Sequence, residues 1–310
     1  MATCARPRGA DEVRELIVSV ADVTEIAVAP DRVRMWSRSI RRSGREVALV
    51  PTMGALHRGH LALVEHAGRL ADVVVVSIFV NPLQFGDVGD LTNYPTPIDD
   101  DVAACRALGV DVVYAPTAAT MYPAGFETYV QPGSLAEEME GRSRAGHFTG
   151  VATIVAKLFG AVEPDVAVFG EKDFQQLAVI RRMATDLDLG VRVEASPTVR
   201  DPDGLALSSR NQRLSSTERA AAVAVPRAIT AAGEVSREAV ATVDAVVGAA
   251  REVLDAEPLA AIDYVTVFDT GTLQPVERFD DRRRPDRYRI AVAVRFGDVR
   301  LIDNAALFER

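Results

Sequence analysis

Two histidines three residues apart are the residues of this chain best suited to phosphate chemistry. His57 and His60 lie in the stretch PTMGALHRGH, between an apolar run at 47–50 and another that begins at Leu61. This pattern predicts a strand, a turn and a helix start, with both imidazoles on one side of the first helical turn. A helix N-terminus carries partial positive charge and unpaired N–H donors, so the pair favours a phosphate site over a metal site. Taken alone, the two histidines fit an ordinary surface or core role equally well.

A second candidate group, GEKD at residues 170–173, comes directly after the apolar run VAVF. Gly170 permits close backbone approach, and Lys172 offers a compact positive charge to a phosphate. Asp173 is able to hold a ribose hydroxyl or a metal. Such tetrapeptides are also common as plain turns.

A third group is LSSRN, at residues 207–211. It combines two hydroxyls with a guanidinium fork suited to phosphate oxygens: Ser208, Ser209 and Arg210. The alternative is a helix N-cap, but Ser216 or Thr217, with Glu218 nearby, is better placed for that role. The segment therefore remains a candidate phosphate-binding loop.

The fourth group consists of amides. Asn81 and Gln84 follow a β-branched run, and Gln175 and Gln176 begin a predicted helix. Amides can fix a small hydroxylated acid by paired hydrogen bonds without adding a competing charge. Each amide taken separately fits a solvated role better than a functional one.

Alternating strands and helices must position these groups. Apolar runs predict strands at 47–52, 73–80, 111–115, 166–169 and 191–195, and helical patterns fall at 31–43, 99–109, 150–160 and 174–187. Short links between them indicate right-handed βαβ crossovers. The sequence thus predicts an α/β fold, a Rossmann-like doubly wound parallel sheet that binds ligands beyond the carboxyl ends of its strands.

The pattern changes near residue 198, so we expect one domain at 1–198 and a smaller α+β domain at 199–310. The alanine-rich stretch 220–256 predicts two helices broken near Gly233. Strands are expected at 262–268, 288–296 and 299–302, the last two joined by a hairpin at 297–298. The basic run at 280–289 fits a solvated loop better than an anion site.

Composition narrows the class of protein. The 310 residues are 48% hydrophobic and carry a net charge of −9, which argues against a nucleic-acid or anionic-membrane binder. The two cysteines, Cys4 and Cys105, have no disulfide or zinc spacing, and no apolar run is long enough for a membrane span. We therefore expect a cytoplasmic protein acting on small molecules. The absence of GxxxxGK[ST] and GxGxxG argues against a P-loop ATPase and a dinucleotide dehydrogenase.

Six motifs, in order, resemble those of the pantothenate synthetase (pantoate–β-alanine ligase) family: PTMGALHxGH, SIFVNPxQF, MYP, RxGHFxGV, FGEKDxQQL and ALSSRNxxLS. The resemblance covers residues 46–219. Beyond it, the C-terminal third matches only in length and in its order of helices and strands.

The resemblance implies an ATP-dependent ligase of the HxGH nucleotidyltransferase superfamily. Pantoate would attack the α-phosphorus of ATP to give pantoyl adenylate and pyrophosphate, and β-alanine would then displace AMP to form pantothenate for coenzyme A biosynthesis. Mg²⁺ would arrive with the nucleotide, with its protein ligands unassigned, and the enzyme would be a homodimer.

Site residues follow by position from the same resemblance. Catalytic roles are implied for His57, His60, Lys172, Ser208, Ser209 and Arg210. These residues would also bind ATP, together with Met53, Gly54, Gly59, Gly170, Glu171, Asp173, Val199 and Leu207. Pantoate and β-alanine would contact Asn81, Gln84 and Gln176.

The chain also departs from the family pattern. It has YPTP at 94–97 where YPRT is common, so a basic contact is lost or moved, and Phe174 replaces a common tyrosine. Asp100 and Asp101 match an acidic patch but are not assigned as metal ligands. Part of residues 1–45 is an N-terminal extension.

Two other functions fit the motifs less well. A nucleotidyltransferase acting on a phosphorylated acceptor would need arginines or lysines where Gln84 and Gln176 stand. A regulatory nucleotide-binding protein would not need the complete set of histidines, lysine and SSRN residues.

Overall fold

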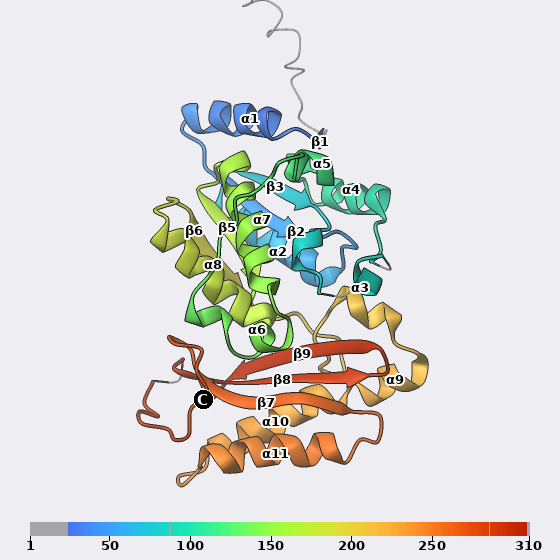
Figure 1. Cartoon of the computed structure of the whole chain (residues 1–310), viewed down its shortest axis with the longest axis vertical. Coiled ribbons are helices and arrows are strands. Elements are labelled where there is room, and N and C mark those ends of the chain that lie inside the picture. The colour runs from blue at the N-terminus through green and yellow to red at the C-terminus, as the bar shows by residue number, and fades with distance from the viewer. Residues whose placement is uncertain (1–23, 87, 93, 285, 309–310) are drawn as a thin grey trace, which may run out of the picture.

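The computed structural model describes residues 24–86, 88–92, 94–284 and 286–308. Figure 1 shows an N-terminal part built around one sheet, and below it a C-terminal part with a second sheet and its own helices. None of the described helices has both the length and the apolar character needed to cross a bilayer.

The N-terminal sheet has six parallel strands in the order β1-β4-β3-β2-β5-β6. The chain moves outward from β2 in one direction through β3 and β4, and in the other through β5 and β6, so the switch point lies between β2 and β5. Ligands bind at such a crevice, beyond the carboxyl ends of the strands. The strands are β1 (Glu25–Ala27), β2 (Val47–Thr52), β3 (Val73–Ile78), β4 (Val112–Tyr114), β5 (Val166–Gly170) and β6 (Arg192–Ser196).

Helices cover both faces of this sheet, as the continuous apolar runs of β2 and β3 require. One core packs α1, α7 and α8 against the sheet, and a second core packs α2 and α4 against its other face. These helices are α1 (Pro30–Arg42), α2 (Arg58–Leu70), α4 (Ile98–Ala107), α7 (His147–Val162) and α8 (Phe174–Asp186). The doubly wound fold expected from the sequence is confirmed.

Short helices line the connections at the carboxyl edge. They are η2 (Pro82–Gln84), α3 (Val88–Thr92), α5 (Ala118–Met121), η3 (Ser134–Ala136), α6 (Glu140–Ser143) and η4 (Glu171–Asp173).

Strand β1 was not predicted. It has three residues and pairs with β4, so residues expected to be a tail or packing segment complete the edge of the sheet. Three residues are too few to show the period-two pattern of a strand. Of the N-terminal extension, residues 1–23 lie outside the described residues.

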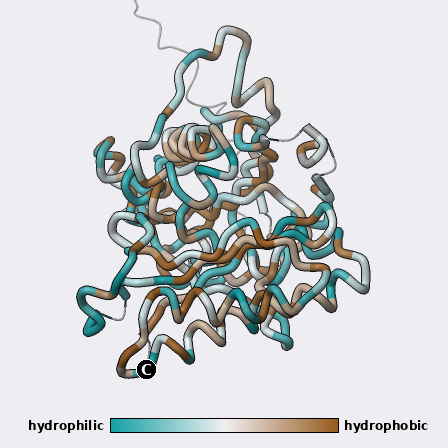
Figure 2. Tube along the Cα trace, turned by 60° about the horizontal axis from the view of Figure 1, so that its bottom comes forward, coloured by the Kyte–Doolittle hydropathy of each residue, from teal (hydrophilic) through white to brown (hydrophobic). Residues whose placement is uncertain are grey.

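The C-terminal sheet is antiparallel, in the order β7-β8-β9. Its expected hairpin is confirmed, with Gly297 in the left-handed region at φ 56°. Figure 2 shows both hydrophobic and hydrophilic residues in this sheet and its helices, and the central strand β8 is buried over most of its length. The elements are η5 (Ser209–Arg213), α9 (Ser216–Ala221), α10 (Ala224–Ser236), α11 (Val243–Asp255), β7 (Ala261–Asp269), β8 (Tyr288–Phe296) and β9 (Val299–Ala306).

Two local predictions in this part were wrong. Gly233 lies inside α10, and the break comes later, before Thr242 caps α11. Likewise, the N-cap of α9 is Ser215, which forms a reciprocal capping box with Glu218, and not Ser216 or Thr217.

One arginine of the basic run at 280–289 has a structural role. The Arg282 guanidinium donates to the backbone oxygens of Ser236 and Ala239, at 2.8 and 2.7 Å. It thereby satisfies carbonyls at the end of α10, where a positive charge is favourable.

Side chains of β9 join the second sheet to the first. The Asn304 amide donates to the backbone oxygens of Glu171 and Lys172, at 3.0 and 2.9 Å. Asp303, 2% exposed, accepts a bidentate pair from Arg200 at 2.6 and 3.0 Å. The last strand therefore holds the turn that follows β5.

Candidate active site

A cavity of about 210 Å³ opens at the carboxyl ends of β2 and β5. Most of the candidate residues line it, although they come from five separate segments. They are Met53, His57, Gly59, His60, Asn81, Gln84, Gly170, Lys172, Asp173, Gln176, Val199, Leu207, Ser208, Ser209 and Arg210. Gly54 and Glu171 are adjacent in sequence but do not line the cavity.

The two histidines stack at the start of α2, with ring centroids 4.0 Å apart. His57 is the N-cap, and its Nδ1 accepts the Gly59 N–H at 3.1 Å. The Nδ1 of His60 accepts the His57 N–H at 3.3 Å. Because each Nδ1 is an acceptor, the hydrogen of each neutral ring is on Nε2. Each imidazole therefore offers one Nε2–H donor.

Burial sets the charge of this pair. Desolvation, reinforced by the charge of Lys172, lowers the pKa of His57 to about 4. Desolvation, followed by the charge of His57, lowers the pKa of His60 to about 3. At neutral pH both rings of the free protein are therefore uncharged donors rather than cations.

Gly59 is required by the geometry of the cap. A Cβ at this position would lie 2.8 Å from Cε1 and 2.9 Å from Nδ1 of His57. Any larger residue would displace the imidazole, so the glycine between the histidines fixes the ring that caps α2.

Asp101 holds the turn before the histidines and was not predicted as a site residue. Its carboxylate accepts the N–H groups of Ala55 and Leu56 at 2.8 and 2.7 Å. Ala55 has a φ of 51° and Gly54 a φ of 83°, a strained turn that needs such support. A Cβ on Gly54 would lie 2.9 Å from the same carboxylate. Asp101 thus shapes the turn, and it does not line the cavity.

Lys172 and Asp173 form the wall beyond β5. Their side chains are 3.5 Å apart. Burial raises the pKa of Asp173, but the charges of Lys172 and Arg210 outweigh it and leave the pKa below its usual value. The carboxylate is therefore ionised.

Three amide side chains line the cavity, those of Asn81, Gln84 and Gln176, and we call them the amide wall. Asn81 and Gln84 belong to one hydrogen-bond network. Asn81 donates to Gln84 Oε1 at 3.0 Å and to the Gly150 carbonyl at 3.1 Å, and it accepts the Tyr122 hydroxyl at 2.7 Å. A Cβ on Gly150 would clash with the backbone of Leu83 and Gln84. The glycine therefore lets α7 approach η2 and fix Gln84 in the wall.

Of the four amides proposed from the sequence, Gln175 has a structural role instead. Its amide donates to the carbonyls of Leu135 and Glu138, and its oxygen accepts the Glu140 N–H. Helical geometry separates it from its neighbour Gln176, which lines the cavity.

The SSRN loop includes a helix cap, although for a different helix than the one considered from the sequence. Ser208 caps the short helix η5 by accepting the Arg210 N–H at 3.3 Å. The Ser209 hydroxyl lies 3.2 Å from that of Tyr94, in the YPTP segment. The segment that departs from the family pattern therefore still touches the loop.

Sequence reasoning missed Arg144 and His147 as site residues, although both occur in the RxGHFxGV motif. His147 Nδ1 lies 2.8 Å from the Gln84 carbonyl, and Arg144 donates to the same oxygen at 3.2 Å. Desolvation, followed by the charge of Arg144, lowers the pKa of His147 to about 4. Both residues line the cavity behind Gln84.

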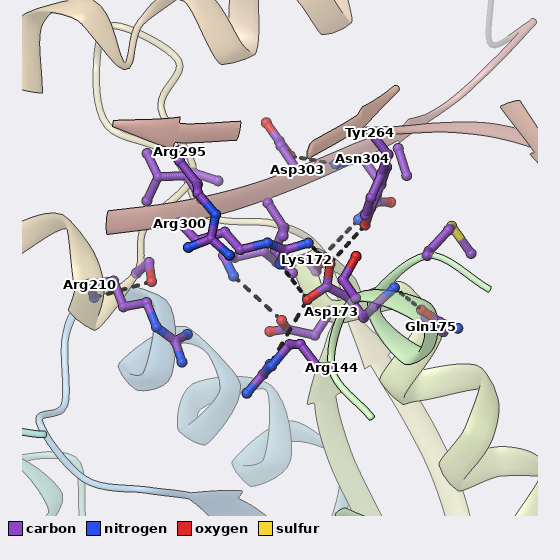
Figure 3. A pocket seen from close by; sticks show the side chains of 18 of the residues that line it. Arg144, Lys172, Asp173, Gln175, Arg210, Tyr264, Arg295, Arg300, Asp303 and Asn304 are labelled. Carbon is purple, nitrogen blue, oxygen red and sulfur yellow. Dashed lines mark hydrogen bonds and ion pairs between the residues drawn. The ribbon is translucent and has the colours of Figure 1, made fainter. Parts of the chain in front are cut away.

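A second, wider cavity of about 780 Å³ lies between the two sheets. It shares Arg144, Lys172, Asp173 and Arg210 with the first cavity, and Figure 3 shows Arg295 and Arg300 entering it from the C-terminal sheet. The shared walls place the two cavities side by side. The C-terminal sheet therefore forms one side of the approach to the site.

No group of three or more potential metal ligands occurs among the described residues. Asp173 is the acidic residue on the lining of the smaller cavity. One carboxylate fits a divalent cation bound largely through substrate phosphates.

Comparisons with known proteins agree with this geometry. The family model for pantoate-beta-alanine ligase matches residues 25–306. The pantothenate synthetase of Saccharopolyspora erythraea is 51% identical over 278 residues, covering 89% of this chain and 88% of the relative. That of Mycolicibacterium paratuberculosis is 50% identical over 277 residues, 89% and 87% of the two chains.

Solved structures give the same result. Pantothenate synthetase from Thermus thermophilus superposes with a TM-score of 0.85 at 44% identity, covering 92% of this chain and all of the other. Pantoate-beta-alanine ligase from Francisella tularensis, complexed with βγ-ATP and β-alanine, gives a TM-score of 0.75 at 32% identity, covering 92% and 98%. The chain therefore belongs to the pantoate-beta-alanine ligase family and catalyses this ligation in pantothenate biosynthesis.

Proposed function

We propose that this enzyme uses ATP to activate pantoate as an enzyme-bound pantoyl adenylate, which β-alanine then converts to pantothenate. The observation that carries the proposal is the pair of stacked imidazoles at the N-terminus of α2, in one cavity with Lys172 and the amide wall. The complex of the Francisella tularensis enzyme with βγ-ATP and β-alanine supports the assignment of two of the substrates.

In the first step, a carboxylate oxygen of pantoate attacks the α-phosphorus of ATP, and the bond to pyrophosphate breaks. The Nε2–H groups of His57 and His60 donate to the phosphate oxygens as negative charge moves between them. Lys172 and Arg210 add positive charge on the opposite wall. Such preorganised donors stabilise the transition state more than water does. Because both histidines are neutral, we assign them hydrogen-bond donation rather than proton transfer.

Pantoate lies against the amide wall. Gln84 and Gln176 face its hydroxyl and carboxylate groups, and Asn81 fixes the orientation of Gln84. Amides recognise these groups without adding a cation to pair with the attacking carboxylate. This wall also favours a hydroxy acid over the phosphorylated acceptor of other nucleotidyltransferases.

In the second step, the amine of β-alanine attacks the acyl carbon. AMP leaves with the bridging oxygen, and the amine loses a proton as the amide forms. The adenylate must be kept from water in the meantime. The SSRN loop and the C-terminal sheet border the site and are suited to exclude it.

Mg²⁺ would be bound by the phosphates of ATP, with Asp173 as the nearest carboxylate on the cavity wall, and would neutralise phosphate charge. The remaining binding contacts proposed for ATP are Met53, Gly54, Gly59, Gly170, Glu171, Val199, Leu207, Ser208 and Ser209.

We also propose two features of the assembly. The domain boundary lies at 198/199, where the chain leaves β6 for the loop that leads to the C-terminal part. The enzyme is a homodimer, a state that sedimentation equilibrium measures directly.

The mechanism is tested with pantoate labelled with ¹⁸O in its carboxylate. One labelled oxygen should appear in AMP, because the bridging oxygen of the adenylate leaves with it, and AMP and pantothenate should form in equal amounts. ATP, pantoate and Mg²⁺ without β-alanine should support exchange of labelled pyrophosphate into ATP. Release of ADP, or AMP without the label, would overturn the adenylate mechanism.

A further inference from the structure

A buried carboxylate joins the two parts of the molecule beside the site. Glu140, in α6, is 7% exposed and accepts hydrogen bonds from the C-terminal sheet at both oxygens. Arg300, in β9, donates to them at 2.7 and 2.8 Å, and the Tyr264 hydroxyl, in β7, donates at 2.9 Å. Arg300 is held in turn by Asp263. Glu140 is thus the acceptor in a contact between the two parts of the chain.

The charge of Glu140 depends on these partners. Burial raises its pKa, but the hydrogen bonds and charge of Arg300 outweigh burial and leave the pKa below its usual value. A buried carboxylate that lost this cation would be strongly destabilising unless another cation replaced it.

Arg144 is placed to be that replacement. Its Nη1 lies 3.9 Å from Oε2 of Glu140, too far for a hydrogen bond but close enough for an ion pair. The same guanidinium contacts His147 and the Gln84 carbonyl, each at 3.2 Å. Figure 3 shows Arg144 and Arg300 reaching the same region from the two parts of the structure. One arginine therefore connects Glu140 to the amide wall.

We propose that Glu140 is a positioning residue that couples closure of the C-terminal sheet to the orientation of Arg144. While β9 is in place, Arg300 and Tyr264 occupy the carboxylate, and Arg144 remains turned toward Gln84 and His147. When β9 moves away, the carboxylate pairs with Arg144 and draws it out of the cavity.

With this coupling, the amide wall has its binding orientation only while the C-terminal sheet covers the site. Arg144 supports Gln84 in the closed arrangement, so substrate binding and exclusion of water occur together. The inference rests on the proposed assignment of this cavity to ATP and pantoate. It goes beyond that assignment because it gives a role to residues outside the cavity wall.

The test is a rescue experiment. Arg300→Gln should lower kcat/KM for pantoate by roughly 10- to 100-fold, because Glu140 then pairs with Arg144 and displaces the amide wall. Adding Glu140→Gln removes the charge that attracts Arg144. The double variant should therefore regain at least a tenth of the activity that Arg300→Gln lost. It should also show a lower KM for pantoate than Arg300→Gln alone. In a purely structural contact, Glu140→Gln would restore stability and kcat by removing the unpaired buried charge, while KM for pantoate stayed the same in all three proteins. That result, or no rescue at all, would overturn the proposal.

Two further variants serve as a control and as a substitute for Arg300→Gln. Arg287→Gln breaks a comparable ion pair to Asp269, at 2.9 Å, within the C-terminal part, and should leave KM for pantoate unchanged. If Arg300→Gln does not fold, Tyr264→Phe removes one hydrogen bond from Glu140 and should raise KM in the same direction, again relieved by Glu140→Gln. Absence of that relief would also refute the coupling.

The two proposals fail in different ways. Normal turnover by His60→Ala would refute the proposed site, whereas rescue by Glu140→Gln would still be measurable. An inactive His60→Ala variant together with a missing rescue would refute the coupling alone.

Discussion

His57 and His60 are locked to the backbone by the same atom of each ring, Nδ1, and their ring planes are inclined by only 26°. The capping box of α2 is thus made by the two residues proposed to act on phosphate. Helix initiation and the proposed chemistry depend on one arrangement, so changes to the histidines should affect activity through geometry as well as through lost donors.

Replacing His60 with alanine should lower the rate of adenylate formation by roughly 10²- to 10⁴-fold, the cost of losing a preorganised transition-state donor. Pyrophosphate exchange into ATP measures this step. His66→Ala is the matched control, because His66 lies on the same helix but not on the cavity wall. Near-normal exchange by His60→Ala would remove His60 from the mechanism.

Replacing Asp101 with asparagine should destabilise the protein by about 1–3 kcal/mol and reduce turnover. An amide has one acceptor oxygen, so either Ala55 or Leu56 would face an NH₂ group instead of an oxygen. Urea unfolding and steady-state rates measure the two effects. Asp99→Asn, at an exposed position of the same helix turn, should change neither. Unchanged stability of Asp101→Asn would mean that the turn does not depend on the carboxylate.

Replacing Gln84 with alanine should raise KM for pantoate far more than KM for ATP, because Gln84 lies on the amide wall and not on the proposed phosphate wall. Initial rates with each substrate varied in turn give the comparison. Gln131→Ala, at an exposed loop position, serves as the control. A larger effect on ATP than on pantoate would contradict the placement of pantoate.

Stability should fall as the pH drops below 6.5. The pKa values of His57, His60 and His147 are lowered from 6.5 to about 4, 3 and 4, so the unfolded chain binds more protons than the folded protein in this range. Each histidine therefore removes up to about 1.4 kcal/mol of stability per pH unit as the pH decreases toward its folded pKa.

Urea unfolding at pH 7, 6 and 5 tests this dependence. The variant His57→Asn/His60→Asn lacks two of the three groups and should show a shallower decline, while asparagine can still cap α2. A double variant with the wild-type slope would show that the two histidines are not buried uncharged in the folded protein.

The parallel sheet was predictable because its strands are continuous apolar runs that end at turn residues. β2 begins and ends where the sequence indicated, and the carboxyl ends of β2 and β5 bring His60 and Lys172 to one cavity. Local pattern and chain order suffice for such elements. The motif resemblance then supplied the candidate residues along the cavity wall.

The residues that sequence reasoning missed act through contacts between distant segments. Asp101 is 46 residues from Ala55, and Arg300 is 160 residues from Glu140. Neither pairing has a local signature, because the partners meet only after the sheets have formed. The break after α10 was missed for a related reason: α10 packs tightly on α11 and the C-terminal sheet, which offsets the modest cost of Gly233 within a helix.

The bond from Asn304 to the carbonyls of Glu171 and Lys172 has a consequence for protein engineering. Consider a chimaera that joins the N-terminal part of this chain to the C-terminal part of a relative. It would keep all the cavity-wall residues that lie before the junction. It would still misplace Lys172 unless the incoming strand carried an amide at the position of Asn304. Exchange of the C-terminal part between relatives is therefore limited by side chains such as Asn304 that lie outside the cavity wall.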